Sequence, residues 1–401
     1  MSLIYLGIVF IVIIVLLAFR RPLYQAISGG LLAIVLLYHM PLAAIFTQAV
    51  HVFTDWSLFS ILVSLYLITF LQRMLEARSQ IKLAQEDLNG LFHNRRINVS
   101  GAALFIGLLP SAAAMILCGD IVKDTTDGYL EPKEQAFVTS WFRHIPESSL
   151  PTYSSVLLMA SLSSVRLGSF IPGMIVPVLT LFALGYFPCL AHLPKDPGTS
   201  RSQNRLRDMR NLFLHLWTLL LILVLILAFG ISVVPAVAIS IVAGIAVYRF
   251  RVPELLSMFR SAFEVKLLLN TFLVLVLKEF IEYSGVLEEL SDILSVLPIP
   301  AYLIFGILFL LGGIISGASG IIALGTPIAF AALEGGMPLM VFLMCMAHAA
   351  SQISPTHVCL VVASDYFHIT LGELIRRTIP VALAFCILMV GYYNLLLMLG
   401  F

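Results

Sequence analysis

Long apolar runs separated by short polar segments form the main pattern of the chain. Ten of these runs approach the length of about 20 residues that an α-helix needs to cross some 30 Å of hydrocarbon. The predicted crossings lie near 3–19, 22–38, 56–72, 147–165, 168–189, 212–230, 232–248, 264–283, 337–362 and 379–400. The pattern therefore predicts an all-α integral membrane protein with about ten transmembrane helices.

Two further apolar segments, 97–118 and 302–333, do not fit as single crossings. If the N-terminus is outside, all of the 23 Lys and Arg residues except Arg166 and Lys278 fall on the cytoplasmic side, as the positive-inside rule requires. A single crossing at either segment would put the later basic loops on the wrong face. We therefore expect re-entrant hairpins near 97–126 and 302–334, with both chain termini outside.

The two halves of the chain show the same order of predicted elements in opposite orientation. Each half has three helices, a less apolar stretch, a hairpin, a broken helix and a final helix, as expected of an inverted repeat. The motifs "PTY" at 151–153 and "PTH" at 355–357 stand 204 residues apart. We predict repeats at 1–191 and 211–401 joined by a cytoplasmic linker at 192–210, with scaffold and transport domains formed from both repeats.

The amino-acid composition also indicates a membrane protein, and it argues against some kinds of binding partner and site. The chain is 60% hydrophobic and 11% charged, and its formal net charge of +1 gives no reason to expect a nucleic-acid partner. Its five cysteines lack Cys-x-x-Cys spacing, so the sequence predicts neither a disulfide framework nor a zinc knuckle. Less apolar stretches, including 129–144, are expected outside the crossings.

The tips of the two hairpins are candidate binding sites. A chain that reverses inside hydrocarbon must be packed in protein or line a wet cavity, because its backbone polar groups need partners. Amides at the start of a half-helix attract an anion, and free carbonyls coordinate a cation such as Na⁺. The tip candidates are Pro110 and Ser111 in the first hairpin, and Gly317, Ser319, Gly320 and Thr326 in the second.

The two broken crossings, "PESSLPTYSS" at 146–155 and "SQISPTHVCL" at 351–360, supply the other candidates. Each proline removes a backbone donor and leaves a carbonyl free, and hydroxyl groups stand beside it. These breaks form a cradle for a solute and an ion, or are kinks in packed helices whose hydroxyls bond back to carbonyls. The hydroxyl candidates are Ser149, Thr152, Ser154, Ser354 and Thr356.

Titratable residues near the breaks are candidates for proton coupling, since ionisable groups at membrane depth are functional candidates by default. They are His357, Asp120, Glu147 and Asp365. Glu147 and Asp365 have a second interpretation, as helix-end groups near the cytoplasmic boundary. Lys278 and Glu282 stand four residues apart on one predicted helix and are expected to pair with each other.

The inverted halves, together with "SPTH" at 354–357, resemble the ion transporter superfamily, which includes dicarboxylate and citrate carriers, gluconate permeases, arsenite pumps and some sodium/proton antiporters. More closely, "RHIPESSLPTYSS" and "SPTHVCLVVASDYF" look like a prokaryotic branch of that superfamily, a domain of unknown function. The resemblance implies a homodimer in the inner membrane, with a transport domain that slides against a scaffold as an elevator. It also implies that Ser111, Thr152, Ser319, Thr326 and Thr356 face the solute.

Two functions follow from these patterns. The first is secondary active transport of a small solute, an organic or inorganic anion, coupled to H⁺ or Na⁺ and without another cofactor. The alternative is an intramembrane serine protease, because Gly317 to Gly320 spell Gly-x-Ser-Gly around Ser319, and His348 or His357 could serve as its base. The protease leaves the first hairpin without a role, so we expect a transporter and not an enzyme.

Overall fold

The computed structural model describes residues 2–401 except 20, 81–82, 85–86, 88–90, 92–93, 109–112, 197–203, 287–297 and 334. Within these described residues every regular element is helical, which confirms the predicted all-α class. The first half contains α1 (Ser2–Ala18), α2 (Leu23–Leu37), α3 (Leu42–Thr54), α4 (Trp56–Ala77), α6 (Arg95–Ile106), α7 (Ala113–Thr126), α8 (Pro132–His144), the 3₁₀ turn η1 (Ile145–Ser148), α9 (Ser154–Ser163), α10 (Leu167–Gly173), α11 (Ile175–Gly185) and the π turn η2 (Tyr186–Leu190).

The second half follows the same order. It contains α12 (Arg205–Leu227), α13 (Val233–Tyr248), α14 (Val252–Ser261), α15 (Val265–Tyr283), α17 (Ala301–Ser316), α18 (Ala318–Ala332), α19 (Gly336–Ser351), α20 (Val358–Tyr366) and α21 (Leu371–Met398). α8 begins at Pro132 and α19 begins 204 residues later at Gly336; α9 and α20 begin at Ser154 and Val358, again 204 residues apart. The spacing of the "PTY" and "PTH" motifs is therefore the spacing of whole helices.

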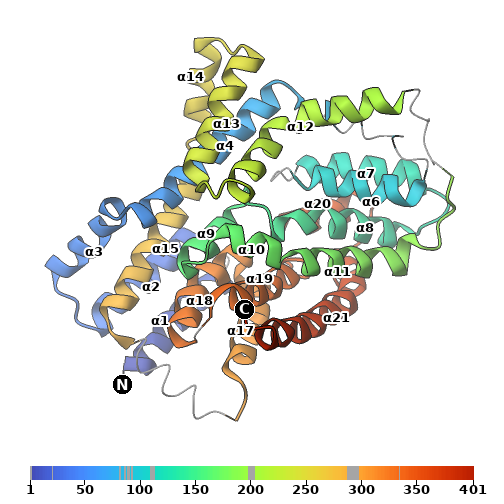
Figure 1. The fold of residues 1–401 in the computed structure, drawn as a ribbon. Coiled ribbons are helices and arrows are strands. Elements are labelled where there is room, and N and C mark those ends of the chain that lie inside the picture. The colour runs from blue at the N-terminus through green and yellow to red at the C-terminus, as the bar shows by residue number, and fades with distance from the viewer. Residues whose placement is uncertain are drawn as a thin grey trace.

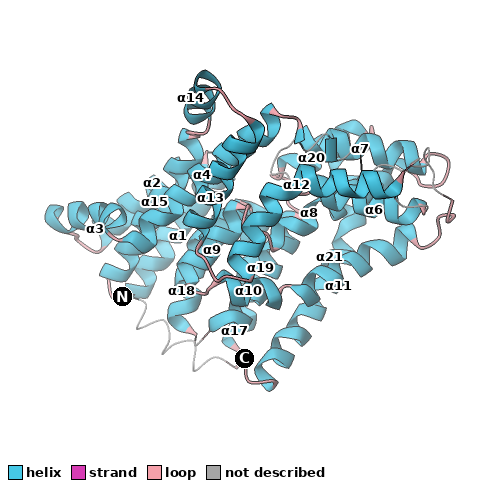
Figure 2. Cartoon of the chain, turned by 45° about the horizontal axis from the view of Figure 1, so that its top comes forward, coloured by secondary structure: helices cyan, strands magenta, loops and turns pink. Residues whose placement is uncertain are grey.

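Helices of one half pack against helices of the other half, and corresponding contacts are found when the roles of the two halves are exchanged. α15 packs on α2 and α3 of the first half, and α4 packs on α13 and α14 of the second. In the same way α18 packs on α9, and α7 packs on α20. Figures 1 and 2 show α3, α2 and α15 on one side of the molecule and α6, α7, α8 and α20 on the other, with α9 and α18 between them. Each half thus completes the packing of the other.

Helix length separates the predicted crossings into two groups. In the described part of the chain, four helical segments are long and apolar enough to cross a membrane: Trp56–Ala77, Leu167–Leu190, Arg205–Leu227 and Leu371–Met398. Other predicted crossings are shorter apolar helices, such as α2 with 15 residues and α13 with 16. These features describe a multi-pass membrane protein in which several helices stop short of the length of a simple span.

Two segments differ from the sequence analysis. Residues 42–54, expected only as part of an outer connection, form α3, whose Leu42 and Phe46 side chains are exposed. The stretch 129–144, expected outside the crossings, contains α8, in which residues 135–144 are all buried. The aromatic rings of α8 explain this burial: Trp141 stacks on Phe137 and donates a hydrogen bond from Nε1 to the Leu181 carbonyl at 2.8 Å. The helix that precedes the first break therefore begins at Pro132.

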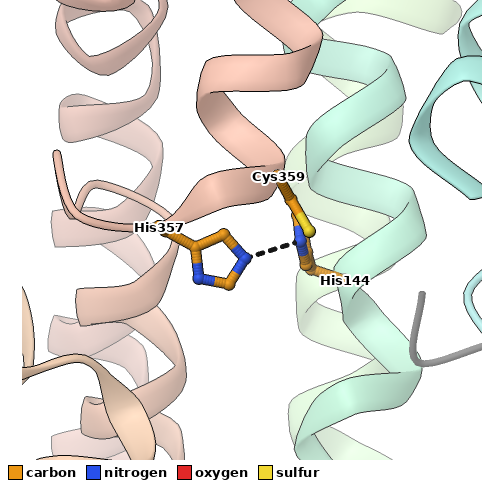
Figure 3. Close-up of side chains that lie close together, drawn as sticks. All are labelled: His144, His357 and Cys359. Atoms are coloured by element: carbon orange, nitrogen blue, oxygen red, sulfur yellow. Dashed lines mark hydrogen bonds between the residues drawn. The ribbon is translucent and has the colours of Figure 1, made fainter. Parts of the chain in front are cut away.

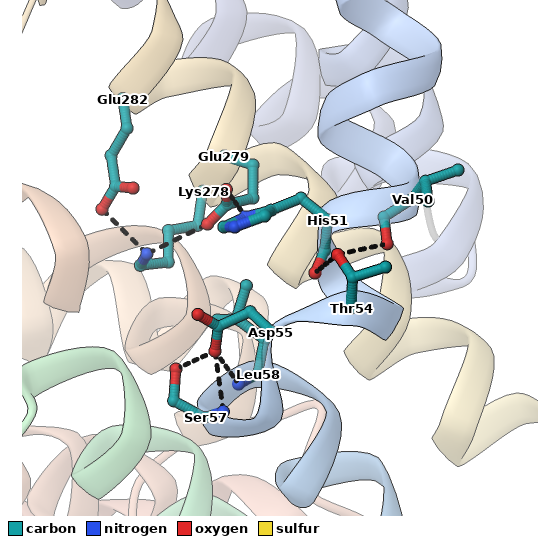
Figure 4. Close-up of polar contacts among 9 residues, drawn as sticks. All are labelled: Val50, His51, Thr54, Asp55, Ser57, Leu58, Lys278, Glu279 and Glu282. Carbon is teal, nitrogen blue, oxygen red and sulfur yellow. Dashed lines mark hydrogen bonds and ion pairs between the residues drawn. The ribbon is translucent and has the colours of Figure 1, made fainter.

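A polar cluster ties α3 to α15, as Figure 4 shows. Lys278 Nζ lies 2.8 Å from Glu282 Oε1, which confirms the predicted pair. The same ammonium lies 3.2 Å from Glu279 Oε1, and the other oxygen of Glu279 lies 2.7 Å from His51 Nδ1 on α3. Lys278, one of the two exceptions to the charge distribution, is thus matched by two carboxylates.

Candidate functional site

The second hairpin turns at Gly317. Its φ of +77° and ψ of 162° belong to a region that is open almost only to glycine. α17 ends at Ser316 and α18 begins at Ala318, so one residue reverses the chain between two packed helices. The Gly-x-Ser-Gly pattern is therefore the tip of a helical hairpin. Whether the hairpin is re-entrant stays a prediction.

Both crossings with prolines are interrupted where the sequence predicts. α8 passes into η1, and the chain then runs without regular helix until α9 begins at Ser154. α19 ends at Ser351 and α20 begins at Val358. The second break is held by hydroxyl groups, since Ser354 Oγ donates to the Ile314 carbonyl at 2.7 Å and lies 2.8 Å from Thr356 Oγ1.

The two breaks and the second hairpin tip enclose one cavity of about 250 Å³. Elements from both halves of the chain form its wall, together with Leu23 from α2. The lining residues are Leu23, Glu147, Ser148, Tyr153, Ser154, Ser155, Ser316, Gly317, Ala318, Ser319, Gly320, Met344, His348, Ser351 and His357.

Three helices begin at this cavity. They are α9 after Tyr153, α18 after Gly317 and α20 after His357, and all three of these N-cap residues line the cavity. None of the three caps accepts a side-chain hydrogen bond from the first turn of its helix. The first amides of a helix have no intrahelical acceptor, and they carry the positive end of the helix dipole. Their convergence favours a negatively charged group in the cavity.

A buried arginine stands behind the cavity. The Arg143 side chain is 1% exposed, and its Nη1 lies 3.5 Å from Glu147 Oε1, which faces the cavity. His144 is equally buried, and its Nε2 lies 3.0 Å from His357 Nε2 on the opposite break. The sequence analysis counted Arg143 only as a cytoplasmic charge. The signal that could have found it is the Arg-x-x-x-Glu spacing immediately before the break.

The structure brings six of the fifteen candidate residues together at one cavity. Glu147, Ser154, Gly317, Ser319, Gly320 and His357 all line the cavity. Ser354 and Thr356 bond to each other in the second break, outside the lining. Thr326 is fully buried inside α18, and its Oγ1 has no hydrogen-bond partner among the described residues.

Other candidates lie elsewhere. Thr152 lines a separate apolar cavity of about 220 Å³ with Phe105 and Leu108, and Ser149 is half-buried outside both cavities. Asp120 and Asp365 are exposed, and Asp120 accepts a hydrogen bond from Tyr366. Pro110 and Ser111 lie outside the described residues.

Comparison with known families decides where the chain belongs. Residues 2–396 match a family described as "Protein of unknown function (DUF401)". The chain belongs to this family. The match to the DUF401 family covers nearly the whole sequence, so the family and the fold described above concern the same residues. A search of curated proteins found no match.

A solved structure shares the fold of this DUF401 member. The crystal structure of the YdaH transporter from Alcanivorax borkumensis, described as having an unusual topology, aligns with a TM-score of 0.59 over 88% of this chain and 87% of that one. The sequences are 15% identical, so the likeness shows a common fold. The place of the DUF401 family within the ion transporter superfamily stays a prediction.

Proposed function

We propose that this DUF401 protein is a secondary active transporter of a small organic or inorganic anion. In this proposal the solute binds in the 250 Å³ cavity, and an elevator movement exposes the cavity to either side of the prokaryotic inner membrane in turn. Transport is coupled to H⁺ or Na⁺, and the protein works as a homodimer. The fold shared with the YdaH transporter supports transport as the activity, and neither comparison supports the serine protease.

The observation that carries the proposal is the meeting of three uncapped helix N-termini at one cavity. Backbone amides at helix starts bind anions without a basic side chain in direct contact. Hydroxyls of Ser154, Ser155 and Ser319 stand beside these amides as further donors. The cavity is smaller than the roughly 300–1,000 Å³ of sites for drug-sized ligands, so it fits a small solute.

Helix length supports a re-entrant second hairpin. α17 has 16 residues and α18 has 15, which at 1.5 Å per residue gives about 24 Å for the longer helix. This is less than the ~30 Å of a hydrocarbon core. A tip at Gly317 inside the membrane is consistent with these lengths. The exchanged helix contacts likewise support inverted repeats.

The substrate class is tested first by thermal unfolding of the purified protein. Organic acids, oxyanions and Na⁺ are screened at several pH values, because a ligand that binds only the folded state raises the melting temperature. We expect at least one anion to raise it, and neutral analogues of that anion not to do so. Stabilisation by neutral solutes alone would contradict an anion site.

Uptake into proteoliposomes then tests transport. The anion found by the screen is offered under an imposed H⁺ gradient, an imposed Na⁺ gradient or neither, and accumulation under one gradient identifies the coupling ion. Ser319→Ala should retain partial uptake, since it removes one of several donors. A protease would lose all turnover in that variant, and wild-type vesicles without accumulation under either gradient would contradict the proposal.

The elevator movement is tested at a second, larger cavity. This cavity of about 570 Å³ is lined by residues of several helices, among them Ser64 of α4 and Ala160 of α9. A Ser64→Cys/Ala160→Cys pair should crosslink to different extents with and without the anion, because the elevator shifts α9 against α4. A crosslink that forms equally in all conditions would count against the movement.

A further inference from the structure

Two histidines and a cysteine lie close together, as Figure 3 shows, and one of them, His357, lines the cavity. His144 is the last residue of α8, His357 precedes α20, and Cys359 is the second residue of α20. One ligand atom from each of the three lies within 4.8 Å of the other two. No local sequence motif predicts this group, because 213 residues separate His144 from His357.

The tautomer of His144 leaves a lone pair directed at the other two residues. Its Nδ1 lies 2.6 Å from the Ser140 carbonyl oxygen, which can only accept, so Nδ1 carries the proton. Nε2 of the neutral ring is then an acceptor, and it faces His357 Nε2 at 3.0 Å. A backbone carbonyl that fixes the far ring nitrogen is the usual support of a metal-binding histidine.

Cys359 stands beside a cationic side chain, and the thiolate of a cysteine is the form that binds metals. Its Sγ lies 3.6 Å from Arg143 Nη1, and a guanidinium group stabilises a nearby negative sulfur. Glu147 balances the arginine, which limits repulsion of a cation. Oε2 of Glu147 also lies 3.9 Å from His144 Nε2, on the cavity side, where it could reach a fourth coordination position.

We propose that His144, His357 and Cys359 form a binding site for a transition-metal ion of the Zn²⁺ class, with Glu147 or a cavity ligand in the fourth position. Imidazole and thiolate suit Zn²⁺ and its neighbours, whereas Mg²⁺ and Ca²⁺ prefer oxygen ligands. Tetrahedral zinc with bonds of about 2.0–2.3 Å separates its ligand atoms by roughly 3.3–3.7 Å. In the structure the two imidazole nitrogens lie 3.0 Å apart, and no two ligand atoms of the group are more than 4.8 Å apart. The bound ion joins the two broken crossings, and the proposal does not depend on transport.

Metal content of the full-length protein in detergent tests the site. The protein is stripped with EDTA, exposed to Zn²⁺ alone, dialysed and analysed by mass spectrometry. We expect about one Zn²⁺ per chain, and an affinity at least tenfold weaker in Cys359→Ser. The matched control is Cys189→Ser: Cys189 is also buried and lies 3.1 Å from an arginine, Nη2 of Arg377, but among the described residues it belongs to no group of three metal-ligating side chains.

Co²⁺ supplies a readout that a purely structural effect would not change. Substituted for Zn²⁺, it should give a tetrahedral visible spectrum with a thiolate charge-transfer band, and the band should vanish in Cys359→Ser but persist in Cys189→Ser. His357→Gln is a second ligand variant at a half-buried position, and gel filtration and circular dichroism confirm that each variant is folded. Equal Zn²⁺ affinity in wild type and Cys359→Ser, or no binding by the wild type, would overturn the proposal and leave a hydrogen bond between two histidines.

Discussion

The two broken crossings occupy equivalent places in the two halves but differ in their side chains. A shift of 204 residues carries Pro151 and Thr152 onto Pro355 and Thr356, and His144 onto His348. The same shift carries Arg143 onto Ala347 and Glu147 onto Ser351. The buried ion pair thus belongs to the first break alone. The backbone pattern is shared, whereas the charge beside the cavity comes from one half.

Both breaks are nevertheless attached in the same manner to a helix of their own half, the first to α6 and the second to α17. Tyr153 donates to the Gly107 carbonyl at the end of α6, and Ser354 donates to the Ile314 carbonyl near the end of α17. Carbonyls at a helix end have no intrahelical donor, so each bond satisfies a group that would otherwise lack one. A phenol and a hydroxyl therefore serve one structural purpose in the two halves.

The largest loss of stability is expected from removing Arg143, the buried charge that has no counterpart in the second break. Arg143→Met leaves Glu147 without the guanidinium it faces, and loss of one partner from a buried pair destabilises by about 3 kcal/mol. Arg143→Met/Glu147→Gln should recover much of that loss, because no uncompensated charge remains. The measurement is the free energy of unfolding in detergent. If the double variant is as unstable as Arg143→Met, the ion pair is not the source of the effect.

Gly107 is expected to tolerate no side chain. A Cβ atom there would lie 2.1 Å from the Arg143 carbonyl oxygen, a backbone atom that cannot rotate away. We expect Gly107→Ala to lower the free energy of unfolding by about 2 kcal/mol. Gly101→Ala in α6 is the control, since nothing lies within 4 Å of its Cβ position; there alanine should stabilise by about 0.5 kcal/mol. Similar losses in both variants would contradict this packing.

A substitution at the hairpin tip tests the cost of backbone strain where there is no steric clash. Nothing lies within 4 Å of a Cβ on Gly317, but its positive φ disfavours any other residue. Gly317→Ala should therefore cost about 1.5 kcal/mol in the free energy of unfolding. Gly168→Ala at the start of α10 has the same open surroundings and no positive φ, so it should be nearly neutral. An unchanged stability of Gly317→Ala would show that the tip adopts another backbone conformation.

The hydrogen bonds that join the first break to α6 and the second break to α17 should be of similar strength. Tyr153→Phe and Ser354→Ala each remove one donor from a helix-end carbonyl, at a cost of about 1 kcal/mol each. Ser354→Ala also removes the contacts of the Ser354 hydroxyl with the Thr356 hydroxyl and backbone amide, which add to its loss. Thermal unfolding of the two single variants and the double variant measures both costs. Losses that add in the double variant would support independent bonds in the two halves. A loss in one variant only would break the proposed equivalence.

Local sequence signals identified the breaks and the second tip because prolines and glycines act on their own backbone. Pro151, Pro355 and Gly317 each lie where the helix is interrupted, and Lys278 and Glu282 meet because one helix carries both. These features needed no knowledge of the fold.

The remaining features depend on contacts between distant segments. α8 contains charged residues and so has the composition of a solvated stretch, yet Arg143 is buried because Glu147 and Cys359 face it. The cluster of His144 and His357 forms only when α8 and α20 pack together. Hydropathy along the chain averages over such pairs and does not detect them.

The smallest effect on stability concerns the short helices α3 and α14. Each of them is joined to a helix of the other half by a contact that involves a charged side chain. His51 joins α3 to α15, whereas both guanidinium nitrogens of Arg78 reach the Glu254 carboxylate, at 2.9 and 3.2 Å, and so join α14 to α4. The hydrogen bond from Arg78, followed by that from the Arg251 backbone amide, lowers the pKa of Glu254 from 4.5 to about 2. Because the folded state favours the Glu254 carboxylate, its interactions contribute their full stabilisation of the fold above pH 4.5. This contribution is lost as the pH falls toward 2.

Hydrogen exchange of the α14 amides between pH 5 and 3, corrected for the intrinsic rate, measures this contribution. Protection of α14 should fall slightly as the pH falls, and it should fall less in high salt, because Glu254 is partly exposed and its charge is screened. Glu254→Gln should remove the pH dependence while leaving α3 unchanged, since α3 is held by His51 and Glu279. The same pH dependence in Glu254→Gln would assign it to another group and would remove the distinction between the two short helices.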